Sequence, residues 1–398
     1  MRLLSFSDRP NFIHAAELVT NDLSIRAPAA ATVNLLGLER AALEALVEEL
    51  GSKPFRARQL MHWLYKAGEA RIDAMTDLAK DFRKLLNERT EVRTPEIMSV
   101  HASADGTRKW LLKADAAQAF EMVFIPEADR GTLCISSQVG CALDCSFCST
   151  GQEGFNRNLS TAEIVGQVWL AKRELGEGKQ TGLPGERIVT NVVLMGMGEP
   201  LANFRAVVPA LRIFLDDFGF DLSRRRVTLS TSGLAPQIRK LAQEVNCALA
   251  VSLHASDDEL RNELVPINRK HPIAELLDAC WHYIDEQNGR SVTFEYVMLA
   301  GVNDSVRQAR ALAALLKDHP AKVNLIPFNP FPGTQYRRSA PAVIESFRDE
   351  LVGRGVLATI RRTRGEDIDA ACGQLAGRVI DRTTARLGGK HMSVAVQP

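Results

Sequence analysis

The stretch that decides the fold reads Cys134-Ile-Ser-Ser-Gln-Val-Gly-Cys141-Ala-Leu-Asp-Cys145-Ser-Phe-Cys148. It begins within an apolar, β-branched run at 132–136, so its cysteines are expected on the loop that leaves a strand. Cys141, Cys145 and Cys148 have the spacing Cys-x3-Cys-x2-Cys. Three thiolates on one loop can hold three irons of a [4Fe–4S] cluster and leave the fourth iron open to a bidentate small molecule. A zinc site with Cys134 as the fourth ligand is the alternative, since zinc also accepts four cysteines.

Strands and helices alternate on the carboxyl side of this run. The predicted strands are 132–136, 189–195, 226–231, 247–253, 292–298, 322–327 and 356–362, and the predicted helices are 161–176, 203–217, 235–244, 273–287, 305–318 and 342–353. Such alternation implies right-handed βαβ units and a parallel sheet. The Gly-x-Gly-x-x-Gly signature is absent after the first strand, which favours a partial or full α/β barrel over a doubly wound sheet. Active sites of α/β barrels lie on the loops that follow the strands.

The remaining segments are assigned from their patterns. Residues 1–32 predict a weakly ordered extension, 94–130 a connector of short strands, 131–388 the barrel core, and 389–398 a tail. Residues 33–93 predict a small helical accessory domain, because three segments carry apolar stripes. The stripes are Leu43, Leu46 and Leu50; Leu60, Trp63 and Leu64; and Leu78, Phe82 and Leu85. The basic residues of this domain (Lys53, Arg56, Arg58 and Lys66) are interpreted as a solvated face.

One acidic residue interrupts an apolar strand in the connector. The run Phe-Glu-Met-Val-Phe-Ile at 120–125 is apolar on both faces except for Glu121. A buried carboxylate is costly unless it is partnered or protonated. The pattern therefore allows a partnered Glu121 inside the protein or an edge strand with Glu121 in solvent.

Composition excludes several classes of protein. The 398 residues are 45% hydrophobic and 24% charged, which is typical of a globular protein. A formal net charge of +1 excludes a globally basic nucleic-acid coat. Residues 351–398 nevertheless carry eight Lys and Arg against four Asp and Glu, which favours an anionic partner. The apolar runs are too short for a membrane span, and Asp8, Arg9 and Pro10 interrupt any secretory signal. Seven cysteines, four of them between 134 and 148, fit a thiol-ligated metal site in the cytoplasm.

Six motifs resemble one family of RNA-modifying enzymes. The cysteine spacing, with Phe147 before the last cysteine, resembles the radical S-adenosylmethionine (SAM) superfamily. Residues 137–159 are similar to the RlmN-type adenosine C2 methyltransferases of RNA. The other similar motifs, in order, are 196–200 (Gly-Met-Gly-Glu-Pro), 226–233, 252–255, 329–333 and 363–375. The similarity covers roughly residues 33–390, and the sequence departs from the family at the N-terminal extension, a longer loop at 177–185 and the last eight residues.

The resemblance implies a binding role for two sets of residues. Cys141, Cys145 and Cys148 would ligate the cluster, whereas SAM would be bound by Gly198, Glu199, Ser230, Ser252, Leu253, His254 and Asn329. Gly198 and Glu199 would take the amino group of SAM. Short polar residues after strands also suit ribose hydroxyls and an adenine edge. The same residues can be explained without a ligand: Gly198 and Glu199 as a strand-to-helix turn, His254 as a structural histidine and Asn329 as a turn residue.

The resemblance assigns catalysis to three further residues. Cys372 would carry the transferred methyl group, Cys134 would be the second, non-ligand cysteine, and Glu121 would accept a proton. Arg361, Arg362 and Arg364 lie close to Cys372 in sequence and would lower the pKa of a nearby thiol. The other two cysteines, Cys247 and Cys280, lie in apolar runs and are interpreted as packing residues.

The implied fold is a partial (β/α) barrel of the radical SAM type with a small N-terminal helical domain. The implied reaction uses one [4Fe–4S] cluster and two SAM molecules per turnover. Cys372 takes a methyl group from the first SAM, and the deoxyadenosyl radical from the second abstracts hydrogen from that methyl group. The methylene carbon then adds to adenine C2, Glu121 removes the C2 proton, and Cys134 releases the product through a transient disulfide.

The implied substrates are an adenosine of 23S rRNA in the peptidyl-transferase centre and the tRNA adenosine 3′ of the anticodon. An external electron donor and a thiol reductant are expected, with no membrane partner and a monomeric chain. The candidate phosphate contacts are Arg224, Arg225, Arg226, the basic C-terminal segment and the N-terminal helical domain. Two alternatives remain: a C8-specific methyltransferase of 23S rRNA that uses the same cysteines, and a zinc-stapled RNA-binding protein without catalytic function.

Overall fold

The computed structural model describes residues 32–176, 187–289 and 291–382. The predicted extension (apart from Thr32), the longer loop at 177–185 and the predicted tail at 389–398 lie outside the described residues. No helix in the described ranges is long and apolar enough to cross a membrane.

An open sheet of ten strands forms the centre of the protein, in the order β14-β13-β12-β11-β10-β9-β6-β5-β4-β3. Seven adjacent strands are parallel. They are β6 (Gly131–Cys134), β9 (Asn191–Leu194), β10 (Val227–Thr231), β11 (Ala248–Ser252), β12 (Val292–Met298), β13 (Ala321–Pro327) and β14 (Leu357–Ile360). All seven match predicted strands. The fold class is therefore confirmed, and the barrel is partial because β14 and β3 form two open edges within the described chain.

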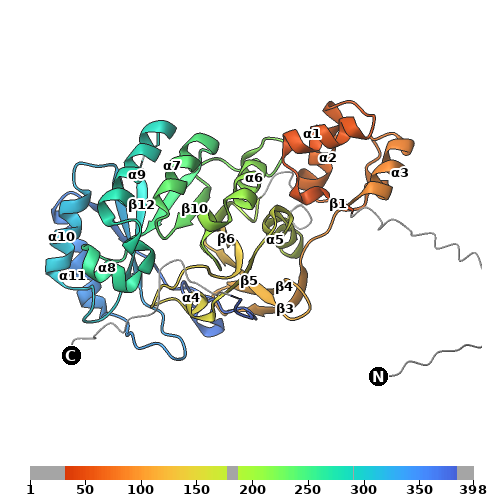
Figure 1. The fold of residues 1–398 in the computed structure, drawn as a ribbon. Coiled ribbons are helices and arrows are strands. Elements are labelled where there is room, and N and C mark those ends of the chain that lie inside the picture. Colours follow the sequence, from red (N-terminus) through yellow and green to blue (C-terminus); the bar gives the residue numbers. More distant parts are fainter. Residues whose placement is uncertain (1–31, 177–186, 290, 383–398) are drawn as a thin grey trace, which may run out of the picture.

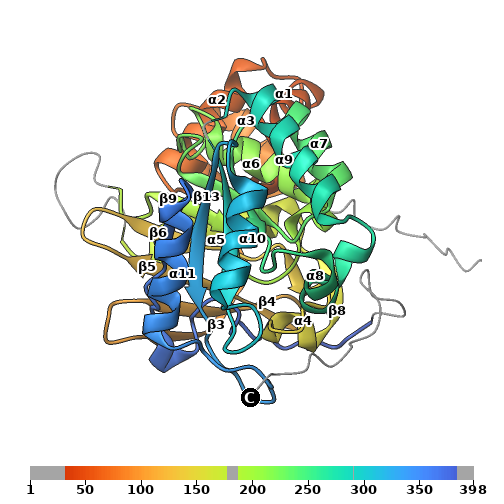
Figure 2. The same ribbon diagram turned by 90° about the vertical axis from the view of Figure 1, so that its left-hand side faces the viewer.

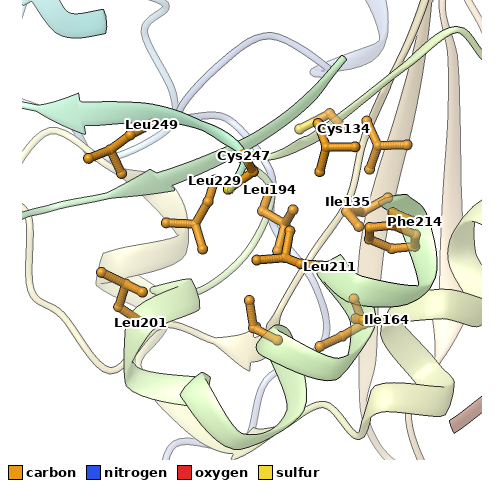
Figure 3. Packing of buried hydrophobic residues seen from close by; sticks show 14 of the residues in the cluster. Cys134, Ile135, Ile164, Leu194, Leu201, Leu211, Phe214, Leu229, Cys247 and Leu249 are labelled. Carbon is orange, nitrogen blue, oxygen red and sulfur yellow. The ribbon is translucent and has the colours of Figure 1, made fainter. Parts of the chain in front are cut away.

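Six long helices follow the parallel strands in the predicted places (Figures 1 and 2). They are α5 (Thr161–Glu174), α6 (Phe204–Leu215), α7 (Ala235–Glu244), α9 (Ile273–Gln287), α10 (Val306–Leu316) and α11 (Pro341–Gly353). The helix α5 begins with a capping box, in which Ser160 and Glu163 satisfy each other's backbone amides. Figure 3 shows Leu194 and Leu229 of the sheet packed with Leu211 of α6, so the apolar strand faces and the helix stripes form one core.

Three antiparallel strands extend the sheet beyond β6. They are β3 (Glu96–Ala102), β4 (Arg108–Lys113) and β5 (Ala119–Pro126). The short strands predicted at 94–130 are thus present, and they continue the central sheet. Because β5 lies between β4 and β6, it is an inner strand. The edge-strand alternative for Glu121 is therefore wrong.

The N-terminal helices are grouped at one end of the molecule (Figure 1). They are α1 (Arg40–Glu49), α2 (Phe55–Met61), which continues as a π-helical turn η2 (His62–Lys66), and α3 (Lys80–Arg89). Short elements complete this region: β1 (Val33–Asn34), η1 (Leu35–Gly37), η3 (Ile72–Ala74) and β2 (Thr90–Glu91). The indole of Trp169 in α5 donates to the carbonyl of Leu64 at 2.8 Å, and Arg40 pairs with Asp216 after α6. These contacts attach the helices to the α5–α6 layer.

The loop after β6 and the C-terminal segment lie together beside the sheet. The loop contains β7 (Gln138–Gly140), α4 (Ser149–Glu153) and β8 (Phe155–Asn158), and the C-terminal segment, described at 361–382, contains the short turn η6 (Glu366–Ile368). The Ser149 amide donates to the carbonyl of Gly373 at 2.9 Å, and Thr150 donates to the carbonyl of Leu375 at 2.6 Å. Residues 134–158 and 361–382 are therefore joined although they are far apart in sequence.

Candidate active site

A cavity of about 970 Å³, including its opening to solvent, lies at the carboxyl ends of the parallel strands. The loop 141–148, the turns after β9, β10 and β11, and the C-terminal segment all contribute to it. Nine of the predicted site residues line this cavity: Cys141, Cys145, Cys148, Gly198, Glu199, Ser230, Ser252, His254 and Cys372. Its place is the one expected for the active site of an α/β barrel.

Three thiols form one wall of the cavity: that of Cys145, which is buried, and those of Cys141 and Cys148, which are half-buried. The Cys141 amide donates to Gly154 O at 2.8 Å and the Cys148 amide to Cys145 O at 3.1 Å, so backbone hydrogen bonds hold the loop. Burial raises the pKa of all three thiols, and the charge of neighbouring cysteines raises the pKa of Cys141 and Cys145 further. A soft, electron-accepting metal centre would stabilise these thiolates, which fits an iron–sulfur group.

The same thiols do not surround a single point. Among the described residues, no three His, Cys, Asp or Glu side chains are arranged to hold one metal ion. A mononuclear zinc site needs such convergence, whereas a [4Fe–4S] cluster binds each cysteine at a different iron. Cys141, Cys145 and Cys148 supply three thiolates from one loop at the cavity wall.

Gly198 and Glu199 form the turn after β9. Gly198 has φ +98°, and a Cβ atom there would lie 2.4 Å from Cβ of Gln138, so only glycine allows the two loops to meet. Glu199 is buried, and its carboxylate accepts from the amides of Leu201 at 3.0 Å and Ser232 at 2.7 Å. Burial raises its pKa. Each carboxylate oxygen has a second lone pair, so Glu199 can still accept from an ammonium group in the cavity.

Ser230, Ser252 and His254 line the cavity from neighbouring strands. Burial lowers the pKa of His254 to about 3, so the imidazole is neutral. Its Nδ1 accepts from the Val297 amide at 3.0 Å, which leaves the proton on Nε2. Phe147 packs edge-on against this ring, with centroids 4.6 Å apart. The histidine therefore links the cysteine loop to the strand ends and keeps one donor.

Two predicted SAM residues do not line the cavity. Leu253 is fully buried, and its amide donates to Glu295 O at 3.0 Å. Asn329 is also buried, and it accepts from Arg338 at 2.7 Å and donates to Cys372 O at 3.3 Å. Asn329 is thus placed to fix the backbone of the Cys372 segment.

Cys372 lines the cavity, and Cys134 lies behind it at the end of β6. Both thiols are free. Burial, and after it the charge of Cys372, raise the pKa of Cys134 to about 12, while the charge of Arg361 opposes this rise. The pKa of Arg361 is raised, first by a Cys372 thiolate and then by the charges of Glu295 and Cys134. Of the three arginines expected near Cys372, Arg361 lines the cavity.

Glu121 is buried and partnered, as one sequence alternative predicted. Its carboxylate lies 3.2 Å from Nζ of Lys109 and accepts from the Ala376 amide at 3.1 Å. Lys109 also donates to the carbonyl of Asp369 at 3.2 Å. Burial raises the pKa of Glu121, while Lys109 opposes the rise. A carboxylate with a raised pKa that touches the Cys372 segment can accept a proton near the cavity.

Sequence reasoning missed two acidic residues at the site. Glu295 in β12 lines the cavity and accepts from Asn324 at 2.8 Å; an acid in a run of apolar residues was the available signal, as at Glu121. Glu153 ends α4 and accepts from the Gly377 amide at 3.1 Å. Burial raises the pKa of Glu153 to about 7, and the charge of Glu121 adds to this rise. Nothing in the sequence places Glu153 near Glu121, because their elements meet only through the C-terminal segment.

Glu153 predicts a pH dependence of stability. Its pKa is about 7 in the folded protein against an ordinary value of 4.5, so the folded state binds this proton more tightly than the unfolded state. The contribution of this proton to the free energy of unfolding is complete below pH 4.5 and is lost as pH rises through 7. Thermal unfolding between pH 5 and 8 should therefore show Glu153→Gln gaining in Tm relative to wild type as pH rises. A constant difference across that range would contradict the assignment; Glu48→Gln, on the exposed face of α1, is the control.

The arginines predicted as phosphate contacts are placed apart from the cavity. Arg224, Arg225 and Arg226 are exposed and precede β10, whereas the cavity lies at the opposite, carboxyl end of that strand. In the helical domain, Lys66 pairs with Asp221 at 3.1 Å. Lys53, Arg58 and Lys66 are exposed and Arg56 is half-buried, in agreement with the solvated face expected from sequence.

Comparison with known proteins agrees with this geometry. The ribosomal RNA large subunit methyltransferase N-terminal domain matches residues 33–92, and the radical SAM superfamily matches residues 135–313. The crystal structure of a radical SAM methyltransferase from Sphaerobacter thermophilus is 44% identical, with a TM-score of 0.79. That match covers 86% of this chain and 99% of the other chain.

More distant solved structures are also similar. The FeFe-hydrogenase maturase HydG from Carboxydothermus hydrogenoformans is 18% identical with a TM-score of 0.38, and the match covers 58% of this chain and 59% of HydG. A domain of pyruvate-formate lyase-activating enzyme from Bacteroides vulgatus is 18% identical with a TM-score of 0.32, covering 43% and 99%. Neither score supports a conclusion about this chain. The 44% identity over nearly the whole chain, the N-terminal domain and the cysteine-lined cavity show that the protein belongs to the RlmN family of radical SAM methyltransferases.

Proposed function

We propose that the protein methylates C2 of adenine in RNA, and that its substrates are the peptidyl-transferase adenosine of 23S rRNA and the tRNA adenosine 3′ of the anticodon. The observation that supports this most is the placement of Cys372 in the same cavity as Cys141, Cys145 and Cys148. A methyl-carrying thiol and a SAM-cleaving site must be close, because the radical has to reach the methyl group.

The cavity residues divide into two groups for this reaction. Cys141, Cys145 and Cys148 would hold the [4Fe–4S] cluster, and Gly198, Glu199, Ser230, Ser252 and His254 would bind SAM. When bound, the cluster supplies the electron that cleaves SAM to a deoxyadenosyl radical, which takes a hydrogen atom from a methyl group. The neutral His254 offers Nε2–H as a donor, and Glu199 offers carboxylate lone pairs to the ammonium group. Leu253 and Asn329 would support these contacts from behind.

Cys372 acts first as a nucleophile. Its thiolate attacks the methyl carbon of SAM, the carbon–sulfonium bond breaks, and S-adenosylhomocysteine leaves. The Arg361 guanidinium lines the same cavity as Cys372, so a positive charge lies at the site of this attack. After hydrogen abstraction, the carbon on Cys372 adds to C2, which joins enzyme and RNA covalently.

Glu121 and Cys134 release the product. Glu121 accepts the C2 proton, and its raised pKa suits that role. Cys134 then attacks the sulfur of Cys372 and a disulfide forms, while the bond from that sulfur to the methylene carbon breaks and this carbon takes up a proton to become the methyl group. The unpaired electron left by the radical addition to C2 would return to the cluster. An external thiol reductant restores both cysteines. Because the high pKa of the buried Cys134 thiol opposes this attack, we expect release to be faster at higher pH.

Replacement of Cys134 tests the release step. Cys134→Ala should still accept a methyl group on Cys372 and attack the RNA, but it cannot form the disulfide. We expect a covalent protein–RNA adduct to accumulate, visible as a slower band in denaturing gels that disappears after ribonuclease treatment. Cys247→Ala, another buried cysteine, is the control and should give no adduct. Normal turnover by Cys134→Ala would show that Cys134 does not release the product.

The position of the methyl group separates the proposal from its closest alternative. Unmodified 23S rRNA and tRNA are incubated with SAM under anaerobic conditions and digested to nucleosides. We expect 2-methyladenosine from both, whereas 8-methyladenosine alone would identify the C8-specific reaction. A zinc-stapled RNA-binding protein would give neither nucleoside, and its RNA affinity would not depend on Cys372.

The remaining proposals concern partners and environment. The target base must leave its stack to enter the cavity, so a loop or a remodelled RNA is the expected substrate. Arg361, in the described part of the basic C-terminal segment, lines the cavity, so this part of the segment is the better placed of the candidate phosphate contacts. A reducing cytoplasm, an external electron donor and a monomeric chain fit the free thiols and the disulfide step.

A further inference from the structure

Arg261 is a buried cation that the proposed reaction does not use. It belongs to α8 (Asp258–Leu264), and its side chain is fully buried. Burying a guanidinium is costly unless it is paired, and buried arginines are usually paired with a carboxylate. Among the described residues, no carboxylate forms an ion pair with it; all its hydrogen-bond acceptors are neutral.

The guanidinium joins two loops of the SAM site. Its Nη2 donates to the carbonyls of Ser232 at 2.8 Å and Ser252 at 3.0 Å, and its Nε donates to the carbonyl of Leu253 at 3.0 Å. These carbonyls follow β10 and β11, the strands that carry Ser230 and Ser252 to the cavity. A fixed fork of donors can hold several acceptors at once, which a single ammonium cannot do.

The remaining contact fixes the guanidinium itself. Nη1 donates to Oδ1 of Asn268 at 2.7 Å, and Asn268 in turn donates to Oδ1 of Asp258 at 2.8 Å and Oδ1 of Asn262 at 2.9 Å. Asn268 lies in η5 (Pro266–Arg269). The cation is therefore held by both α8 and η5 and cannot turn away from the cavity loops.

The helix that carries Arg261 lies against the cysteine loop. The amide of Ser146, the residue after Cys145, donates to the carbonyl of Leu264 at the end of α8 at 3.2 Å. Burial lowers the pKa of Arg261 to about 10, and the charge of a Cys145 thiolate opposes this fall. Ser232, whose carbonyl accepts from Arg261, also donates its amide to Glu199. The guanidinium therefore lies directly behind the turns that carry the SAM residues. In a buried setting of low dielectric, such a charge interacts strongly with neighbouring anions.

We propose that Arg261 is a positioning residue with two effects: it fixes the SAM loops after β10 and β11, and its charge compensates the negative charge of the thiolate site at Cys141, Cys145 and Cys148. The second effect rests on the proposed cluster. One electron added to a three-thiolate cluster increases its negative charge. A nearby buried cation makes that reduction easier, so Arg261 raises the reduction potential.

Substitution by glutamine and by lysine separates the two effects. Arg261→Gln removes the charge, and we expect reduction of the cluster to become about tenfold less favourable, a fall of about 59 mV for a one-electron couple. Arg261→Lys keeps the charge but lacks the fork. It should keep the potential and bind SAM about fivefold more weakly, the cost of a lost hydrogen bond. Arg212 lies on α6 and pairs with Glu39 and Glu244. Arg212→Gln removes this arginine and should change neither the reduction potential nor the affinity for SAM.

The measurements use the full chain reconstituted with iron and sulfide: a redox titration followed by electron paramagnetic resonance, and calorimetric titration with SAM. A folded Arg261→Gln protein with the wild-type potential would overturn the charge compensation. If that variant does not fold, the Arg261→Lys variant tests both effects. A tenfold less favourable reduction of its cluster would contradict the charge effect. Wild-type affinity for SAM would contradict the positioning effect. If the wild type takes up no iron, the cluster proposal fails as well; normal wild-type values with unchanged variants would refute only the role of Arg261.

Discussion

The Cys372→Ala variant is expected to lose methylation of RNA by at least about 10³-fold, the order of loss seen when a nucleophile is removed. The thiol is the proposed carrier of the transferred carbon, so no other cavity residue can replace it. The cluster should remain, because the three cysteines of the 141–148 loop are unchanged. The measurement is single-turnover transfer of labelled methyl from SAM to unmodified 23S rRNA, with iron content determined on the same sample.

Cys280→Ala is the matched control for this experiment. Cys280 is fully buried in α9 and packs in the core, so its loss removes a thiol without touching the cavity. We expect this variant to methylate RNA at near the wild-type rate at a temperature where it is folded. Methyl transfer by Cys372→Ala within tenfold of wild type would show that the methyl group does not pass through this residue.

The second large effect is expected from the cysteine loop. Cys145→Ala should take up little iron in anaerobic reconstitution and should lose all methylation, because two thiolates cannot hold the cluster with one open iron. The variant protein should be nearly colourless where the wild type is brown. Cys141→Ala and Cys148→Ala should behave in the same way.

Cys247→Ala separates this effect from general damage to the fold. Cys247 precedes β11, is buried and does not line the cavity, so its variant should bind iron like the wild type. Iron and sulfide per chain, together with the visible spectrum, provide the measurement. Wild-type iron content in Cys145→Ala would rule out this residue as a ligand, and zinc in place of iron in the wild type would favour the RNA-binding alternative.

Much of the fold can be predicted from the sequence, because buried parallel strands read as continuous apolar runs. The run 292–298 became β12 and the stretch 273–287 became α9 with those bounds. The three cysteines could be placed at the strand ends for the same reason, since the loop directly follows β6. Because β10 and β11 are parallel neighbours, Ser230 and Ser252 lie at the same, carboxyl end of the sheet.

The C-terminal segment marks the limit of sequence reasoning. Residues 361–382 have little periodicity, so nothing in their pattern shows that Cys372 returns to the cavity or that Ala376 meets Glu121. The segment is held by single hydrogen bonds to groups more than 200 residues away in sequence, such as Thr150 to Leu375. Lys109 is missed for a similar reason: its pairing with Glu121 depends on the register of β4 against β5.

The central claim is that three cysteines hold a cluster with an open site where SAM is cleaved. The most direct test is production of 5′-deoxyadenosine by the reconstituted protein with SAM and a strong reductant under anaerobic conditions. We expect deoxyadenosine to form in the wild type and to be absent in Cys145→Ala. Wild-type protein that contains a full complement of iron but forms no more deoxyadenosine than Cys145→Ala would contradict the claim.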